Sequence, residues 1–183
     1  ENMIRVFREG KDLHAATAAN IYKKDINEVT RDERSKSKRA NFGIIYGITV
    51  FGLAERLDID RSEAKQLIDG YFDTFPQVHD YMEKAKALAR EQGYVTTLFG
   101  RRRYLPDINS ANAVVRGFAE RNAINAPIQG TAADIIKVAM IRIFQRFQQE
   151  GIRSKMILQV HDELNFSVYP EERSQVERIV LEE

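Results

Sequence analysis

The chain has 183 residues, of which 43% are hydrophobic and 30% are charged, and its formal net charge is +1. It is long enough for one domain or for part of a larger one, and it has no apolar stretch of about 20 residues that could span a membrane. The absence of cysteine excludes disulfide bonds, thiolate zinc sites and cysteine nucleophiles, and it is compatible with a reducing cytoplasm.

Helical periodicity and capping residues predict helices over most of the first two thirds of the chain. The expected helices cover residues 12–24, about 30–46, 60 onward, 76–93, 111–124 and 128–149. Thr30 or Asp32 is expected to cap the second of these, and Asp60 with Glu63 forms a candidate capping box for the third. Pro127 is expected to break the pattern between the last two helices. An extended pair is expected around residues 94–99, before a glycine.

The final third of the chain has a strand pattern in place of the helical one. Two β-rich runs, residues 156–160 and 164–168, flank His161-Asp162-Glu163, which predicts a hairpin with a polar, acidic tip. A last helix is expected to start near Glu171. Helices with a small antiparallel sheet place the chain in the α+β class.

Positive charge is clustered rather than abundant, with basic runs at residues 31–39 and 101–103. In the first run, four side chains follow one another at four-residue steps: Arg34, Lys38, Phe42 and Tyr46. Each step advances about 40° beyond a full helical turn, so the four drift slowly along one helix face. Two cations followed by two rings suit a nucleoside triphosphate, since cations neutralise phosphates and a flat ring supports a base.

The alternative is an amphipathic surface helix whose rings pack into a core and whose charges are solvated. Ile44 and Ile45 supply apolar contacts at other angles, which favours the binding hypothesis. Gly43 and Gly47 are expected to leave bare backbone beside the rings, where a ligand or base pair could approach closely.

The stretch from Arg34 to Gly47 resembles the nucleotide-binding helix of the family A DNA polymerases, with Arg, Lys, Phe and Tyr-Gly each separated by three residues. The resemblance implies that Arg34 and Lys38 hold the triphosphate. It also implies that Phe42 stacks on the incoming base and sugar. Tyr46 would then occupy the template-base slot until the helix closes.

Two details refine the resemblance. The family often has a second Arg directly after the first, whereas this chain has Ser35, which puts one auxiliary contact in doubt. Single-subunit RNA polymerases carry a related helix but usually lack the Asn-Phe-Gly found at residues 41–43, so DNA polymerase is preferred.

The acidic hairpin also resembles a family element, the catalytic hairpin. Nucleotide joining uses two magnesium ions that stabilise the attacking and leaving oxygens, and magnesium prefers carboxylate oxygens. By resemblance Asp162 is a metal ligand, Glu163 is an acidic neighbour with a weaker role, and His161 contacts the primer strand. The residues assigned to catalysis are Asp162 and Glu163 from this hairpin, together with Lys38 from the nucleotide-binding helix. Taken alone, an Asp in a turn has an ordinary backbone explanation.

Three further segments resemble family elements. The family segment around His14 touches the triphosphate, although a lone histidine on a helix is otherwise more often a cap or core residue. The run at 101–103 resembles a family element near the template, and the resemblance implies that Arg103 contacts DNA. The alternative is a solvated loop. Arg121, Asn125 and Gln129 resemble residues that read the minor groove, where acceptors occur in every correct base pair. The Asn before Ala-Pro is alternatively a helix terminator.

The family's other catalytic carboxylate, on an upstream strand resembling Asp-Tyr-Ser-Gln-Ile-Glu-Leu-Arg, does not occur in this sequence, and neither does the thumb. Both ends are interpreted as cut. The expectation is a partial polymerase domain, with fingers over about residues 12–110 and part of the palm over about 111–183. Alone, such a fragment is expected not to polymerise, and an unpaired sheet edge is expected to promote non-native self-association.

The resemblance therefore implies a parent enzyme that adds deoxynucleoside triphosphates to a primer 3′-hydroxyl on primer-template DNA, with two Mg²⁺ ions. A bacterial-type protein of the cytoplasm, associated with the nucleoid, is expected. The alternative is a catalytically silent nucleic-acid-binding module on the same scaffold.

Overall fold

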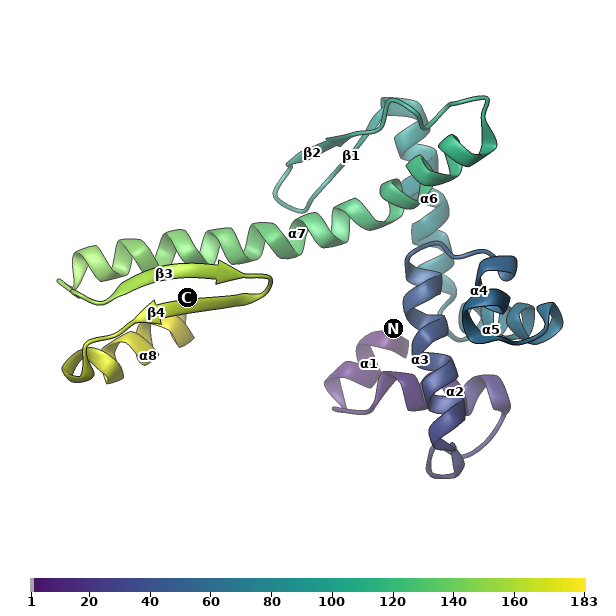
Figure 1. Cartoon of the computed structure of the whole chain (residues 1–183), viewed down its shortest axis with the longest axis horizontal. Helices are drawn as coiled ribbons and strands as arrows, with labels where there is room; N and C mark the ends of the chain where they lie inside the picture. Colours follow the sequence, from purple (N-terminus) through teal and green to yellow (C-terminus); the bar gives the residue numbers. More distant parts are fainter. Residues whose placement is uncertain (1) are drawn as a thin grey trace. The chain divides into compact units, whose positions relative to one another are not determined.

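The computed structural model describes residues 2–183 and divides into two compact units. The first unit contains the chain up to Thr96 together with Arg102–Pro127, and the second contains Thr97–Arg101 together with Ile128–Glu183. Helices and two small antiparallel sheets make up both, so the α+β class is confirmed (Figure 1). Within the described part of the chain, no helix is long and apolar enough to cross a lipid bilayer.

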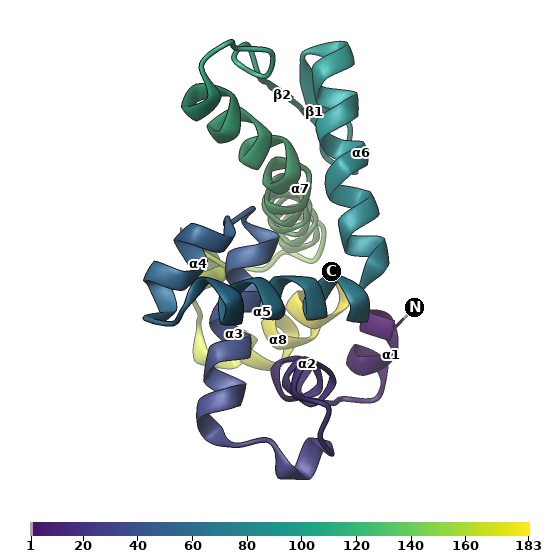
Figure 2. The ribbon, with the colours of Figure 1, turned by 90° about the vertical axis from the view of Figure 1, so that its right-hand side faces the viewer.

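The first unit is built mainly from short helices. They are α1 (Asn2–Arg8), α2 (Leu13–Tyr22), the 3₁₀ turn η1 (Ile26–Glu28), α3 (Arg31–Ile45), α4 (Val50–Leu57), α5 (Arg61–Thr74), α6 (Pro76–Gln92) and the first part of α7 (Ala113–Gln149). Helix α3 packs against α2, α4 and α5, as Figure 2 shows from the side. The core between them contains the fully buried Ile44, Leu53, Leu67 and Tyr71.

Helix α3 begins and ends where capping chemistry predicts. The Thr30 hydroxyl accepts a hydrogen bond from the backbone N–H of Glu33 at 3.2 Å, and the Glu33 carboxylate accepts one from the N–H of Thr30 at 2.9 Å. This reciprocal pair satisfies two donors that a helix N-terminus leaves free. At the other end, Gly47 adopts a left-handed φ of +73° that a β-carbon would disfavour.

Two helices of the first unit were not expected from the sequence. Helix α1 was not predicted, and α4 escaped notice because it has only eight residues and contains a glycine. The expected capping box of α5 is only half present. Asp60 does accept from the N–H of Glu63 at 2.7 Å, but the Glu63 carboxylate forms an ion pair with Lys36 of α3 at 3.2 Å.

The strands β1 (Tyr94–Thr96) and β2 (Arg102–Tyr104) form an antiparallel pair. The prediction placed both strands before Gly100, which is wrong, because the second strand follows that glycine. Val95 and Leu105 pack with Ile108, Ala119 and Ala123 in a second core cluster. This cluster fixes the β1–β2 pair against α6 and the first part of α7.

Pro127 does not break the helix, contrary to the prediction, since α7 is continuous from Ala113 to Gln149. A proline inside a helix removes one N–H and crowds the preceding turn. Tertiary contacts on that turn favour the helix nonetheless. Ala123 and Ile124 are buried, and the Tyr81 hydroxyl donates a hydrogen bond to the Ile124 carbonyl at 2.8 Å.

The second unit places a hairpin against two helices. Strand β3 (Lys155–Val160) pairs antiparallel with β4 (Glu163–Ser167), followed by the 3₁₀ turn η2 (Pro170–Glu172) and helix α8 (Arg173–Glu182), so the predicted hairpin and last helix are confirmed. Ile143 and Phe147 of α7 meet Val176 and Ile179 of α8 in the core.

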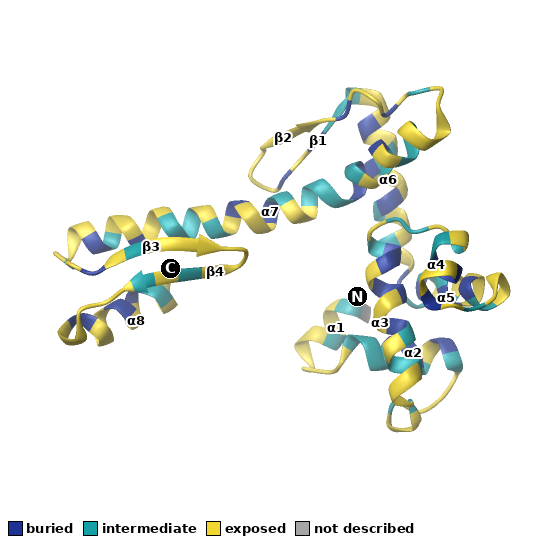
Figure 3. Cartoon of the chain, viewed as in Figure 1, coloured by how far each residue is buried: buried dark blue, intermediate teal, exposed yellow. Residues whose placement is uncertain are grey.

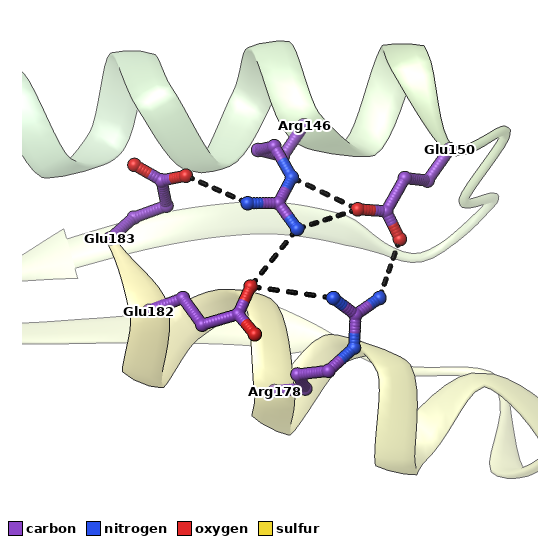
Figure 4. A network of polar contacts seen from close by, with 5 residues as sticks. All are labelled: Arg146, Glu150, Arg178, Glu182 and Glu183. Atoms are coloured by element: carbon purple, nitrogen blue, oxygen red, sulfur yellow. Dashed lines mark hydrogen bonds and ion pairs between the residues drawn. The ribbon is translucent and has the colours of Figure 1, made fainter.

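A network of ion pairs joins the ends of α7 and α8 on the surface (Figure 4). Arg146 binds Glu150 at 2.7 Å, Glu182 at 3.0 Å and Glu183 at 3.0 Å, and Arg178 binds Glu150 at 2.7 Å. Exposed pairs contribute little individually, so the network chiefly fixes how the two helices lie together.

Candidate functional site

The side of α3 that was predicted to bind a nucleotide is exposed to solvent. The rings of Phe42 and Tyr46 are 47% and 48% exposed, Lys38 is exposed and Arg34 is half-buried. Buried and exposed residues alternate along this helix (Figure 3). The two rings therefore do not belong to the core, in contrast to the amphipathic-helix alternative. The core side of α3 is occupied by Ile44 and smaller residues.

Arg34 is held by a carboxylate from α2. Its Nε and Nη2 atoms donate to the same oxygen of Asp12 at 2.9 and 2.5 Å. The other Asp12 oxygen caps α2 by accepting from the N–H groups of His14 and Ala15. Burial alone would raise the pKa of Asp12, but the bonds from Ala15 and Arg34 outweigh it, and this pKa lies below its usual value.

Lys38 forms no ion pair or hydrogen bond with any residue that the structure describes, although it lies one turn beyond Arg34. Lysine is a compact point charge on a flexible stem. Its ammonium group is therefore available to an anion that approaches this face of α3.

His14 lies beside the same face. Its ring is tilted by 47° against the Phe42 ring, with centroids 5.6 Å apart. Its Nδ1 atom lies 3.1 Å from the side-chain amide nitrogen of Asn41, which also donates to the hydroxyl of Thr17 at 3.1 Å. The structure thus brings together His14, Arg34, Lys38 and Phe42 around the contact between α2 and α3.

The electrostatics of this cluster act on the histidine. Burial lowers the pKa of His14, the Asp12 carboxylate raises it, and the cations of Arg34 and Lys38 lower it, with a net decrease. A lowered pKa keeps the imidazole neutral near pH 7 while no anion is bound.

Gly43 of α3 and Gly47, just after the helix, have a different role from the predicted one. A β-carbon on Gly43 would lie 3.0 Å from the Ile48 side chain, and one on Gly47 would lie 3.0 Å from Cγ of Arg121. Bare backbone at these positions therefore admits protein side chains instead of a ligand. One consequence is that the side chain of Arg121 of α7 packs beside Gly47, just past the end of α3.

The predicted minor-groove residues lie along α7. Arg121 is exposed and its guanidinium lies 5.9 Å from the centre of the Phe118 ring. Asn125 is half-buried and donates to the Arg121 carbonyl at 2.9 Å, which occupies one of its amide hydrogens. Gln129, in the second unit, is exposed.

The three consecutive arginines have different surroundings. Arg101 binds Asp134 at 2.8 Å and the Gly130 carbonyl at 3.0 Å, so it anchors its loop on α7. Arg102 lies over the Tyr94 ring at 4.9 Å. Arg103, the candidate DNA contact, is exposed and forms no ion pair within the described part of the chain.

The acidic residues lie at the tip of the β3–β4 hairpin, where Val160 pairs with Glu163 around a two-residue loop. His161, Asp162 and Glu163 are all exposed. His161 has a left-handed φ of 53°, and the Gln159 side chain donates to its carbonyl at 2.7 Å. Among residues 2–183, no group of three or more His, Cys, Asp or Glu side chains converges as a complete metal site.

Two residues at the α2–α3 contact had not been assigned a role from the sequence. Asp12 was quoted only as part of the segment that contains His14, and its preference for helix N-caps was the available signal. Asn41 was used only to recognise the Asn-Phe-Gly signature. Its burial, at 2% exposure, depends on packing that periodicity does not show.

Comparison with known proteins identifies the family. The sequence profile of DNA polymerase family A matches residues 1–183, which is the whole chain. The chain belongs to DNA polymerase family A. The resemblance seen in the sequence is therefore confirmed.

Individual relatives agree with this assignment. DNA polymerase I of Caldicellulosiruptor bescii is 46% identical over 183 residues, which is 100% of this chain and 22% of the relative. DNA polymerase I of Bacillus caldotenax is 49% identical over 182 residues, covering 100% of this chain and 21% of the relative. The chain thus spans about a fifth of the length of these relatives.

A solved structure has the same fold. The POL domain of Pol1 from M. smegmatis, in complex with DNA primer-template and dNTP, aligns with a TM-score of 0.89 and 47% identity. The alignment covers 98% of this chain and 32% of the other.

Proposed function

We propose that this chain is the nucleotide-binding part of a DNA-directed DNA polymerase, whose parent enzyme adds deoxynucleoside triphosphates to a primer 3′-hydroxyl. The observation that carries the proposal is the exposed face of α3, where Arg34, Lys38, Phe42 and Tyr46 follow one another beside His14. In this proposal the fingers subdomain covers about residues 12–110, and part of the palm subdomain covers about residues 111–183. The proposal includes a parent that acts in the cytoplasm at the nucleoid, and its similarity to bacterial relatives supports a bacterial origin.

The cationic half of the face binds the triphosphate in this proposal. Lys38 has no competing carboxylate among the described residues and would contact the phosphates directly. Arg34 is held in place by Asp12 and would offer its remaining N–H groups. His14 would add a hydrogen-bond donor from α2. Charge-assisted bonds of this kind are stronger than neutral ones.

The aromatic half binds the base and sugar. The half-exposed Phe42 ring offers a flat surface, and base–aromatic stacking contributes about 1–3 kcal/mol per base. Tyr46 would occupy the template-base position until the helix closes. Stacking accepts any base, so sequence would be read from the template.

DNA contacts are assigned to Arg103, Arg121, Asn125, Gln129 and His161. All except the half-buried Asn125 are exposed. The presence of DNA primer-template in the related Pol1 structure supports this part of the proposal. Amide and guanidinium donors would contact minor-groove acceptors common to all correct pairs.

The hairpin tip offers a carboxylate of the kind that binds magnesium. Asp162 is an exposed carboxylate without an ion pair to any described residue, and Mg²⁺ is commonly held by one or two carboxylates together with substrate phosphates and waters. Asp162 would hold the metal, with Glu163 as an acidic neighbour. Two bound Mg²⁺ ions would stabilise charge on the attacking and leaving oxygens.

Calorimetric titration of the chain with a deoxynucleoside triphosphate in magnesium buffer tests the proposal. Lys38→Ala is expected to weaken binding about tenfold or more, because a charged hydrogen bond contributes about 1.5–3 kcal/mol. Lys84→Ala is the matched control, since Lys84 is also an exposed helical lysine without an ion pair in the described residues. Equal losses for both variants would contradict the proposal. Binding of primer-template DNA without nucleotide binding would favour the nucleic-acid-binding module.

A further inference from the structure

The side chain of Asn41 is buried at the contact between α2 and α3. Its Nδ2 atom lies 3.1 Å from Thr17 Oγ1 and 3.1 Å from His14 Nδ1. Its Oδ1 atom is buried without a hydrogen-bond partner in the described residues. Buried polar groups are costly to leave unpaired, so an asparagine here calls for an explanation.

Thr17 determines which end of the amide faces the histidine. The Thr17 hydroxyl is fully buried and donates its single hydrogen to the Leu13 carbonyl at 2.7 Å. It therefore receives a hydrogen from Asn41, which places the amide nitrogen, and not the oxygen, on this side. The second amide hydrogen of Asn41 then points at His14 Nδ1.

A ring nitrogen that accepts a hydrogen bond carries no hydrogen itself. With Nδ1 accepting from Asn41, the single hydrogen of a neutral His14 must be on Nε2. The charged groups facing the ring are Asp12, Arg34 and Lys38, and their combined effect with burial is a lowered pKa of His14. The neutral form, in which the tautomer matters, is thus favoured.

We infer that Asn41 is a positioning residue that holds His14 as its Nε2–H tautomer, so that an approaching phosphate oxygen meets a donor and not a lone pair. The inference deepens the proposed function and rests on it for the identity of the ligand. The opposite tautomer would present an unprotonated nitrogen to the anion and repel it. Asn41 itself would not touch the nucleotide.

Nitrogen NMR of the imidazole rings tests the tautomer without any nucleotide, because a bare ring nitrogen resonates far downfield of one that carries hydrogen. At about pH 8 the free chain is expected to show His14 with a bare Nδ1 and a protonated Nε2. His79, which contacts the Phe72 ring and not an asparagine, is the internal control. A wild-type His14 with hydrogen on Nδ1 would overturn the inference.

Two variants sharpen the result. Asn41→Ala removes the donor and is expected to give a mixture of His14 tautomers while His79 is unchanged. Asn41→Asp substitutes an acceptor and is expected to reverse the tautomer to Nδ1–H. Circular dichroism checks that both variants fold, and the wild-type spectrum decides the matter if either does not. Retention of the wild-type tautomer in both folded variants contradicts the inference.

A nucleotide titration separates this inference from the proposed function. If both are right, Asn41→Ala weakens deoxynucleoside triphosphate binding by up to about tenfold. If wild-type His14 has the Nε2–H tautomer but no nucleotide binds, the proposed function fails while the tautomer assignment stands. If nucleotide binds equally well to a variant with reversed tautomer, the positioning role of Asn41 is refuted.

Discussion

The guanidinium of Arg34 and the carboxylate of Asp12 form an ion pair of 2.5 Å that joins the first turns of α3 to the N-cap of α2. One carboxylate thereby caps a helix and orients a cation. His14, two residues after Asp12, lies within the field of the same charges. The pair consequently links the position of the Arg34 guanidinium to the protonation of the neighbouring histidine.

The pKa of His14 should respond in opposite directions to two substitutions. Asp12→Asn keeps a good N-cap but removes a charge that raises the pKa of His14, so this pKa is expected to fall. Lys38→Ala removes a cation that lowers the pKa of His14, so this pKa is expected to rise. NMR titration of the imidazole signals measures both. Shifts of the same sign would contradict the opposing charge effects, and the absence of any shift would show that burial alone controls this pKa.

Gly130→Ala is expected to destabilise the second unit by about 1–3 kcal/mol through overpacking. A β-carbon at this position would lie 2.6 Å from Cγ2 of Thr97, in the loop that Arg101 anchors on α7. Gly-to-Ala changes in a helix interior otherwise stabilise by about 1 kcal/mol. Urea denaturation measures the difference.

The same helix provides the control and the rescue. A β-carbon on Gly117 meets only Arg121 Nη1 at 3.5 Å, so Gly117→Ala should stabilise the chain or leave it unchanged. Adding Thr97→Ser to Gly130→Ala removes the clashing methyl group and keeps the hydroxyl, and stability should recover. A stabilising Gly130→Ala would show that the loop does not pack as described.

Glu172 should make the second unit sensitive to acid. Its carboxylate accepts bonds from the Ser154 hydroxyl at 2.6 Å, the Ser154 N–H at 2.8 Å and Arg153. The Ser154 hydroxyl first, and then the backbone N–H groups of Arg153 and Ser154, lower the pKa of Glu172 to about 2. Because the folded-state pKa is below the unfolded value of about 4.3, this stabilisation is complete above that value and is lost as pH falls toward about 2.

Thermal unfolding followed by circular dichroism over this pH range checks the effect. Glu172→Gln is expected to lower the midpoint at neutral pH and to flatten its fall in acid. Glu177→Gln removes an exposed partner of Arg173 and should change little. If the acid dependence of Glu172→Gln equals that of the wild type, another carboxylate is responsible.

Local chemistry explains what the sequence predicted well. The predicted features include the Thr30 cap of α3, Gly93 after α6 and the β-rich runs on either side of His161. Each depends on neighbours within a few residues, so capping rules and β propensity were sufficient. The exposure of Phe42 also followed from local pattern, because Ile44 already supplied the core contact.

Several of the wrong predictions have tertiary causes. Pro127 remains helical because contacts from Tyr81 and the buried side of α7 act on its turn. The partner of Glu63 is Lys36 on another helix, and Gly47 makes room for Arg121, which lies 74 positions later in the sequence. The His14–Asn41 contact likewise joins two helices, so no spacing rule could have revealed it.

The most direct test is an NMR comparison of two ligands on the 183-residue chain, inorganic tripolyphosphate and a deoxynucleoside triphosphate. Tripolyphosphate is expected to shift the signals of His14, Arg34 and Lys38 only. The nucleotide is expected to shift these and also the rings of Phe42 and Tyr46. Nucleotide-induced shifts that spare α3 and gather elsewhere on the chain would contradict the assignment of this face as the nucleotide site.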